Sequence, residues 1–256
     1  MKTSSPENAD FIVQKLPSDV GIHRNPRKGT LNAPYVLLED FEFSKTVMED
    51  EVFPDEFDLE ETHRRIEENT FELAGYGKPL LSIGGDHSVS FPVIKALKQG
   101  NPELQLVWLD SHLDLKEPVE DHVSHDVVVR KLLDSGFDEE DIWFVGITRV
   151  DHDEEEFLEG RNLRVFRANE HQEFLREFES SEQPVYLSVD IDVLEGDQAP
   201  GTGYPDGELS LEQVEEVIET VSPGFADLVE VAPPLDEEGK TVENARALLR
   251  SLEQQF

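Results

Sequence analysis

Short apolar runs alternate along the chain with longer stretches in which apolar residues recur at helical spacing. Most of the apolar runs are continuous, which is typical of strands that are buried on both faces of a sheet. These predicted strands are residues 11–16, 79–83, 104–110, 141–147, 163–168, 184–193 and 227–233. The predicted helices are residues 61–77, 88–100, 125–136, 170–181, 209–222 and 241–256. Strand and helix in alternation predict an α/β fold with three α/β/α layers and a mainly parallel central sheet.

No repeat, low-complexity linker or change in composition interrupts this pattern, so we expect a single domain over residues 1–256. Residues 20–60 fit the pattern least well, and we expect loops at residues 24–34 and 48–61. In a parallel sheet covered by helices, chemistry is carried by the loops at the carboxyl ends of the strands. Candidate functional residues should therefore follow the predicted strands.

The charge of the chain limits its partners. It has 58 acidic and 22 basic residues, a formal net charge of -36, and so should repel nucleic acids and anionic membranes. The acids are spread along the whole chain rather than gathered in a tail. We interpret this as a halophilic protein, because a salt-rich cytosol would screen the self-repulsion, with an ordinary acidic protein as the alternative.

The absence of certain residues and segments excludes other classes. There is no cysteine, which excludes disulfides, thiolate nucleophiles and sulfur-ligated metal sites. No run approaches the roughly 18 apolar residues that span a bilayer. The first ten residues have no apolar segment of the kind found in signal peptides. We therefore expect a cytoplasmic protein.

Three predicted strands end in potential metal ligands. The first ends at Asp86 and His87 in "GGDHS", where the glycines would allow a turn and Ser88 would suit the N-cap of a helix. The others end in two groups with i, i+2 spacing, which directs extended side chains to the same side of the chain. These groups are Asp110, His112 and Asp114 in "DSHLD", and Asp190 with Asp192 in "SVDID".

Charge decides between a metal site and a solvated acidic surface. If these strand ends are neighbours, four carboxylates share one cleft, where burial and repulsion would prevent all of them from staying ionised. Two divalent cations would balance them, and the two imidazoles would add nitrogen ligands. Such an oxygen-rich set without sulfur favours manganese, or another octahedral ion, over structural zinc.

The motifs "GGDHS", "DSHLD", "SVDIDVLEGDQAPGTGYP" and "EVAPPLD" resemble the four signature stretches of the ureohydrolase family, which includes arginase, agmatinase and formimidoylglutamase. They occur in the order of that family, and the resemblance covers roughly residues 75–250. It implies an arginase-like three-layer fold with two manganese ions bridged by a hydroxide. It also implies a homo-oligomer, either a trimer or a hexamer.

The resemblance implies a role for each matching position. One ion would be held by His87, Asp110, Asp114 and Asp190, and the other by Asp110, His112, Asp190 and Asp192. Asp110 and Asp190 would be the bridging, catalytic carboxylates, and Asp86 would orient a ligand imidazole or the turn. Departures from the family pattern leave every ligand in place but blur the substrate. They are Ser111 for alanine, Asp126 for glycine, Glu195-Gly196 for Asp-Pro, Glu208 for glycine and a poorly matched entry at "KGTLNAP".

The resemblance also implies how substrate would be bound. His125 would shuttle a proton, unless it is only a residue at a helix N-terminus, and Glu230 would bind the cationic head of the substrate. Thr202 would support the substrate or a ligand. Asp151 and Glu154 would meet an α-amino group, whereas Lys116 would favour a carboxylate tail unless it is a solvated lysine.

The implied reaction is hydrolysis of a small cationic or zwitterionic guanidino compound, arginine or agmatine, to urea and an amine. Two alternatives remain open from the sequence. One is a formimidoylglutamase of the same family, which releases formamide from N-formimidoyl-glutamate. The other is a metal-binding paralogue without catalysis, against which the intact ligand set, His125 and Glu230 all count.

Overall fold

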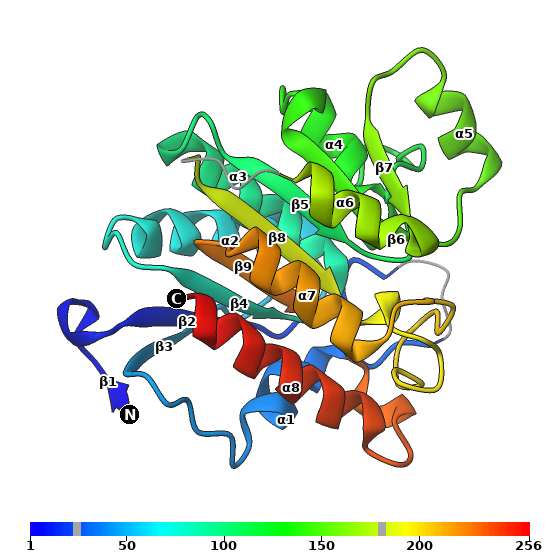
Figure 1. Ribbon diagram of the computed structural model, residues 1–256. Coiled ribbons are helices and arrows are strands. Elements are labelled where there is room, and N and C mark those ends of the chain that lie inside the picture. Colours follow the sequence, from blue (N-terminus) through cyan, green and yellow to red (C-terminus); the bar gives the residue numbers. More distant parts are fainter. Residues whose placement is uncertain (23–26, 179–182) are drawn as a thin grey trace.

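A nine-stranded sheet forms the centre of the computed structural model, which describes residues 1–22, 27–178 and 183–256 (Figure 1). Its strand order is β1-β3-β2-β4-β9-β8-β5-β6-β7, and every neighbouring pair is parallel. The strands are β1 Lys2–Thr3, β2 Phe11–Leu16, β3 Val47–Glu51, β4 Leu80–Gly84, β5 Gln105–Leu109, β6 Ile142–Ile147, β7 Arg164–Arg167, β8 Val185–Asp190 and β9 Phe225–Val229. The predicted parallel sheet is confirmed. All described strands share it, in line with the single domain, which stays a prediction.

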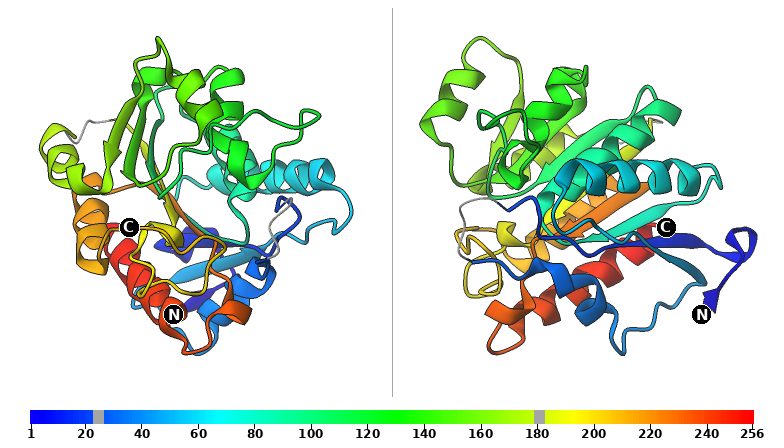
Figure 2. Two further views of the ribbon diagram at one scale, coloured as in Figure 1. Left: turned by 90° about the vertical axis from the view of Figure 1, so that its right-hand side faces the viewer. Right: turned by 180° about the vertical axis from the view of Figure 1, so that it is seen from behind.

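Helices cover both faces of the sheet (Figure 2). Apolar residues of α2 Leu59–Ala74, α3 Ser90–Gly100, α4 Val128–Asp134 and α5 His152–Leu158 pack into the core on one face. Those of α1 Ala33–Leu38, α6 His171–Glu177, α7 Leu211–Val221 and α8 Lys240–Gln255 pack into the core on the other. No described helix is both long and apolar enough to cross a membrane.

Successive side chains along each strand point to opposite faces of the sheet, so the molecule has two separate hydrophobic cores. In β5, Val107 and Leu109 belong to one core, whereas Leu106 and Trp108 belong to the other. All four side chains are fully buried, so this strand is apolar on both faces and reads as a continuous apolar run. The three-layer α/β/α prediction is confirmed.

The region predicted as loops contains regular structure. Strand β3 and the first residues of α2 lie in the predicted loop 48–61, and α1 begins inside the predicted loop 24–34. Residues 24–26 lie outside the described part of the chain. Strand β3 has only the two-residue β1 on its outer side, so most of its side chains are half-buried and its sequence, VMEDE, is largely acidic. Helix α1 has six residues, too few to show a helical period.

Four neighbouring strands bring the candidate ligands together. In the order β4-β9-β8-β5, Ile83 pairs with Leu228, Asp190 with Val229, and Leu109 with Val189. The carboxyl ends of these strands therefore lie at one level on one edge of the sheet. The candidate metal ligands and Glu230 lie at or just after the carboxyl ends of these four strands.

Candidate active site

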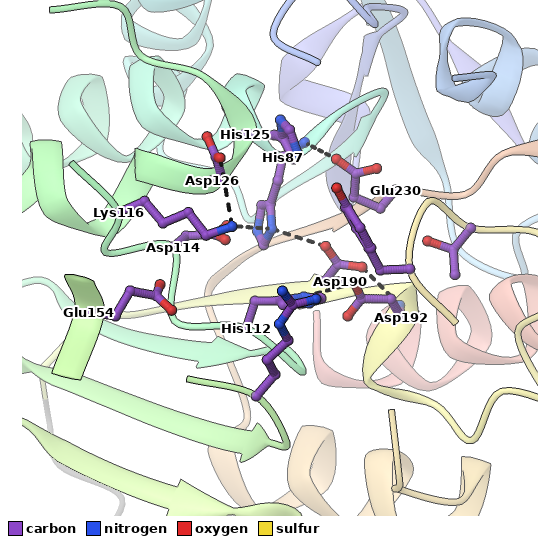
Figure 3. Close-up of a pocket in the computed structure, with 13 residues that line it drawn as sticks. His87, His112, Asp114, Lys116, His125, Asp126, Glu154, Asp190, Asp192 and Glu230 are labelled. Atoms are coloured by element: carbon purple, nitrogen blue, oxygen red, sulfur yellow. Dashed lines mark hydrogen bonds and ion pairs between the residues drawn. The ribbon is translucent and has the colours of Figure 1, made fainter. Parts of the chain in front are cut away.

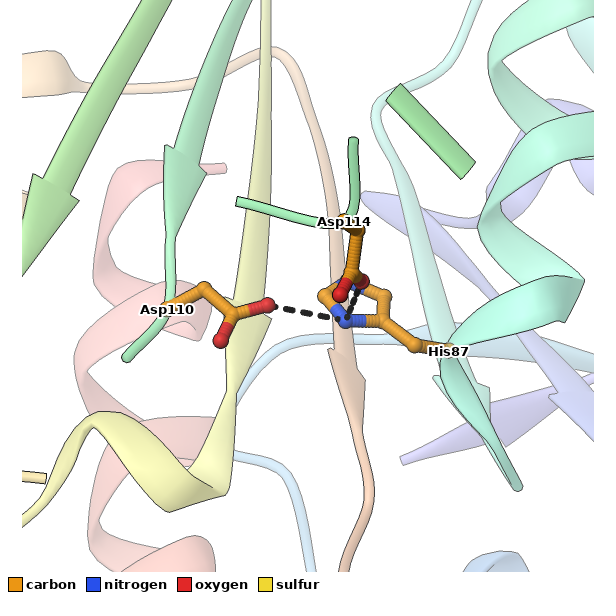
Figure 4. Close-up of side chains that lie close together, drawn as sticks. All are labelled: His87, Asp110 and Asp114. Atoms are coloured by element: carbon orange, nitrogen blue, oxygen red, sulfur yellow. Dashed lines mark ion pairs between the residues drawn. The ribbon is translucent and has the colours of Figure 1, made fainter. Parts of the chain in front are cut away.

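His87 lies at the centre of a buried acidic cluster (Figure 4). Its Nδ1 atom is 3.1 Å from a carboxylate oxygen of Asp110, 3.1 Å from one of Asp190 and 3.4 Å from one of Asp114. The ring stacks on Trp108, with the centroids 4.0 Å apart and the planes 4° from parallel. All four polar side chains are buried. The strand ends of β4, β5 and β8 thus converge as predicted.

Asp110 joins this group to the second imidazole. Its Oδ2 faces His87, while its Oδ1 lies 3.5 Å from Nδ1 of His112. The same His112 nitrogen is 3.1 Å from Asp192, whose other oxygen accepts hydrogen bonds from the hydroxyl and the backbone N–H of Ser111. The structure therefore provides two adjacent groups of potential ligands, His87 with Asp110 and Asp114, and His112 with Asp110 and Asp192.

The hydrogen bonds of His87 show that the first group needs a positive charge. Its Nε2 lies 2.8 Å from the hydroxyl of Ser188, and that hydroxyl donates its one hydrogen to Asp227 at 2.8 Å. Ser188 must then accept from Nε2–H, which leaves a lone pair on Nδ1 in the neutral imidazole. A lone pair directed at three carboxylates is repulsive, so either a second proton on Nδ1 or a metal ion must lie between them. Burial lowers the pKa of His87, but the carboxylates of Asp110 and Asp190 outweigh burial and raise this pKa well above its usual range.

Burial and repulsion act on the same carboxylates. Burial, followed by the charge of Asp110, raises the pKa of Asp114 well above its usual range. Burial and the charges of Asp192 and Asp110 do the same to the pKa of Asp190. Two buried atoms, Nδ1 of His87 and Oδ2 of Asp110, have no hydrogen-bond partner. Missing partners at the convergence of the cluster are what a metal site requires, so the donor set fits bound divalent ions.

Two site residues adopt left-handed backbone conformations, Asp114 with φ 51° and Glu230 with φ 62°. Such conformations are unfavourable for residues other than glycine and often occur at functional sites. Glu230 follows β9, and its Oε1 accepts the backbone N–H of His87 at 2.8 Å. Burial raises the pKa of Glu230 to about 7, although the nearby His125 opposes that shift. The strained backbone thus directs an acid toward the imidazoles.

His125 is held by the backbone of the segment around Gly21. The carbonyl of Gly21 accepts the backbone N–H of His125 at 3.3 Å and lies 3.2 Å from its Nδ1. A carbonyl only accepts, so Nδ1 carries the hydrogen and Nε2 is the basic atom. Gly21 is in turn held by Asp86, whose carboxylate accepts its N–H at 3.1 Å.

Asp86 also accepts the N–H of Ser88 and caps the short helical turn that begins at His87. The predicted cap at Ser88 is therefore wrong, and Asp86 holds the turn rather than an imidazole. The neighbouring glycines do not have positive φ angles. A Cβ on Gly85 would lie 1.7 Å from the carbonyl oxygen of Ser18, so glycine allows close approach of two chain segments rather than an unusual turn.

A cavity of about 70 Å³ lies over the cluster (Figure 3). Of the predicted substrate-binding residues, Glu230, Lys116, Glu154 and Thr202 line it, as does His125. Thr202 contributes a buried hydroxyl without a hydrogen-bond partner. Asp151 is not among the described lining residues and instead pairs with Lys116 and with Arg149, 3.1 and 2.9 Å away.

Three further residues line this cavity that sequence reasoning did not assign to substrate: Asp126, Arg149 and Tyr204. Arg149 lies two residues beyond the end of β6, and its position just after a strand is a signal that the sequence contains. Asp227 was also missed, although an acid in the buried strand β9 is a detectable signal. Nothing in the local sequence marks Tyr204.

Comparison with known proteins identifies the family of the chain. The sequence profile of the Arginase family matches residues 18–253. An agmatinase of Bacillus anthracis is 35% identical over 197 residues, which cover 73% of this chain and 67% of that protein. A guanidinobutyrase of Pseudomonas aeruginosa is 32% identical over 202 residues, which cover 72% and 63% of the two chains.

The fold is also shared. The structure of proclavaminate amidino hydrolase from Streptomyces clavuligerus superposes with a TM-score of 0.87 at 23% identity, covering 99% of this chain and 94% of that one. The chain belongs to the arginase family. The family predicted from the four motifs is thereby confirmed, as is the enzyme class, a hydrolase of C–N bonds in linear amidines.

Proposed function

We propose that the chain is a binuclear-manganese amidinohydrolase that hydrolyses a guanidino compound, such as arginine or agmatine, to urea and an amine. The main support is the buried cluster in which Nδ1 of His87 faces three carboxylates, in one cavity with His125 and Glu230. The agmatinase and guanidinobutyrase among the relatives support a guanidino substrate.

The residues present would hold two ions. His87, Asp110, Asp114 and Asp190 would hold one, and Asp110, His112, Asp190 and Asp192 the other. Oxygen donors with two imidazoles and no sulfur suit manganese. Such ions, when bound, supply a nucleophile near neutral pH by lowering the pKa of water. Asp110, whose two oxygens face different imidazoles, would help to hold both ions.

Glu230 would bind the planar cationic head of the substrate. Its carboxylate lines the cavity and is oriented by the N–H of His87, which contacts Oε1. A carboxylate can accept two parallel hydrogen bonds from a guanidinium, which fixes both the position and the plane of the group. The guanidino carbon would thereby be held over the ligand cluster.

His125 would move the proton. In the reaction a C–O bond forms from water to the guanidino carbon, and the C–N bond to the substrate tail breaks. The leaving nitrogen needs two protons to depart as an alkylammonium ion, and water supplies both as its oxygen becomes the carbonyl oxygen of urea. Nε2 of His125 is its basic nitrogen because Nδ1 donates to Gly21, so it can accept the first proton and deliver it to the leaving group. The products are urea and an alkylammonium ion.

The test is a urea-release assay over guanidino compounds with protein stripped by a chelator and reloaded with manganese. We expect no activity in the stripped protein, and recovery with two bound ions per chain. Asp110→Asn should lose both ions and activity, because its oxygens face both imidazoles. Asp141→Asn is a matched control, since that acid pairs with Lys98 and does not line the cavity.

The alternatives predict different results. Formamide release from N-formimidoyl-glutamate, without urea from any guanidino compound, would identify a formimidoylglutamase. Two bound ions without hydrolysis of any compound would identify the non-catalytic paralogue. On the family resemblance alone we also propose a homo-oligomer, trimer or hexamer, which light scattering would measure.

A further inference from the structure

Two basic side chains line the solvent-exposed part of the candidate active-site cavity. Lys116 follows the ligand Asp114 by two residues, and Arg149 follows β6 by two. Both line the cavity, and both keep a substantial part of their side chains exposed, 33% for Lys116 and 50% for Arg149. The chain has only 22 basic residues against 58 acidic ones, so a pair of cations at one cavity is unusual for this molecule.

Asp151 holds both cations from outside the cavity lining. Its Oδ2 is 3.1 Å from Nζ of Lys116, and its Oδ1 accepts from Nε of Arg149 at 2.9 Å. A second contact, from Nη2 of Arg149 to Oδ2, measures 3.4 Å. The carboxylate that the sequence suggested as a receptor for a substrate amine is therefore engaged by two positive side chains, which it orients.

Glu154 is occupied as well. Its two oxygens accept the backbone N–H groups of Leu115 and Asp151, at 3.1 and 2.9 Å, and the residue is 3% exposed. It therefore ties the segment before Lys116 to the first turn of α5. Asp126 accepts the hydroxyl of Ser124 at 2.6 Å and lies 3.9 Å from Lys116. Beyond the ligand cluster and Glu230, the proposed receptor for the guanidino head, the described lining thus presents two cations and one partly exposed acid, Asp126, with Glu154 buried.

From this arrangement we propose that the preferred substrates carry a carboxylate at the end opposite the guanidino group. The inference rests on the proposed function, since it concerns the tail of the same substrate. Lys116 and Arg149 would bind the carboxylate through charge-assisted hydrogen bonds, with Asp151 as a positioning residue. A terminal amine, as in agmatine, would meet two like charges. The substrate class is therefore ω-guanidino carboxylates rather than guanidino amines.

Three compounds of similar length share the guanidino head and differ in the charge at the opposite end, so they measure the contribution of the tail alone. 4-Guanidinobutanoate carries a carboxylate, agmatine an amine and butylguanidine no charge at the far end. We expect kcat/KM to be highest for 4-guanidinobutanoate, lower for butylguanidine and lowest for agmatine, with the carboxylate preferred over the amine at least tenfold. Preference for agmatine, with urea still released, would overturn the inference and leave the proposed function standing. Urea release from none of the three, nor from arginine, would overturn the proposed function itself.

Substitutions of Lys116 and Arg149 test whether these two residues cause the preference for a carboxylate tail. Lys116→Met and Arg149→Gln should each lower the ratio of kcat/KM for 4-guanidinobutanoate over butylguanidine by roughly 10- to 100-fold, the usual effect of one charged hydrogen bond. Lys116→Arg should retain most of the ratio. Lys98→Met and Arg161→Gln are matched controls, because each cation pairs with one acid away from the cavity. An unchanged ratio in both cavity variants, with metal content and melting temperature preserved, would overturn the assignment.

Discussion

His125 differs from the other imidazoles of the site in what holds it. His87 and His112 face carboxylates, whereas His125 is attached to the carbonyl of Gly21 through both its backbone N–H and its Nδ1. That carbonyl cannot donate, so it selects one tautomer and leaves Nε2 basic. A residue held in this way suits proton transfer better than metal binding.

Replacement of His125 by asparagine should therefore separate chemistry from binding. We expect kcat to fall roughly 100-fold or more, the usual effect of losing a positioned acid–base group. KM and metal content should change little, because His125 is proposed to hold neither substrate nor metal. The measurements are steady-state kinetics with metal analysis of the same preparations.

His152→Asn is a suitable control, since that side chain is 84% exposed on α5 and does not line the cavity. If His125→Asn loses its metal, the residue is a ligand or supports one. If kcat is unchanged, the proton is carried by another group.

At the scale of elements, the strands that are buried on both faces were the ones that the sequence predicted well. Strand β5 was recognised because Leu106 to Leu109 are all fully buried, so no polar residue interrupts the run. Strand β3 was not recognised. It is half-buried near the edge of the sheet, where acidic side chains are allowed, and its sequence therefore contains no continuous apolar run. Parallel pairing then explains why candidate ligands far apart in sequence lie close together, since the carboxyl ends of parallel strands share one edge.

Contacts between distant segments could not be predicted in the same way. The two glycines before Asp86 suggested a turn, but Gly85 is required by the approach of Ser18, about 65 residues earlier in the chain. Asp151 matched a family position, yet its role depends on Lys116, which reaches it from beyond the end of β5, as well as on its near neighbour Arg149. A single sequence has no signal for such pairs.

The packing of α2 against the start of α3 contains a buried titratable group that does not line the active-site cavity. His63 on α2 lies 3.3 Å from the hydroxyl of Ser88, and its ring is near Phe91. Burial, with a smaller contribution from the positive charge of Lys95, lowers the pKa of His63 to about 4. The imidazole is therefore buried in its neutral form.

This depressed pKa should make the fold less stable in mild acid. Between the unfolded value near 6.5 and the folded value near 4, the unfolded chain binds the proton more readily. The contribution of His63 is therefore complete above about pH 6.5 and is lost as the pH falls toward 4. The full loss is about 3 kcal/mol.

Urea unfolding at a series of pH values would measure this loss of unfolding free energy. His63→Gln, which removes the titration, should show a shallower decrease in the free energy of unfolding between pH 6.5 and 4. His152→Gln, at an exposed position, should follow the wild-type curve. Equal slopes for wild type and His63→Gln would mean that water reaches His63 in the folded state.

At the scale of the whole molecule, charge is the dominant feature. The net charge of -36 is distributed over the sheet edges, the helices and the loops alike, and many of the 22 basic side chains already pair with acids. Compaction brings the remaining acids closer together than they are in the unfolded chain, so self-repulsion destabilises the folded state at low ionic strength. Salt should relieve this.

We therefore expect the melting temperature at pH 7 to rise with potassium chloride. Screening shortens the Debye length from about 10 Å at 0.1 M to about 3 Å at 1 M, so most of the gain should occur below about 1 M. Sodium chloride should have the same effect, because screening depends on ionic strength and not on the cation. A gain that appears only at multimolar concentrations, and is larger with sulfate, would instead indicate exclusion of salt from the protein surface. A constant melting temperature across the series would contradict the halophilic interpretation and leave an ordinary acidic surface.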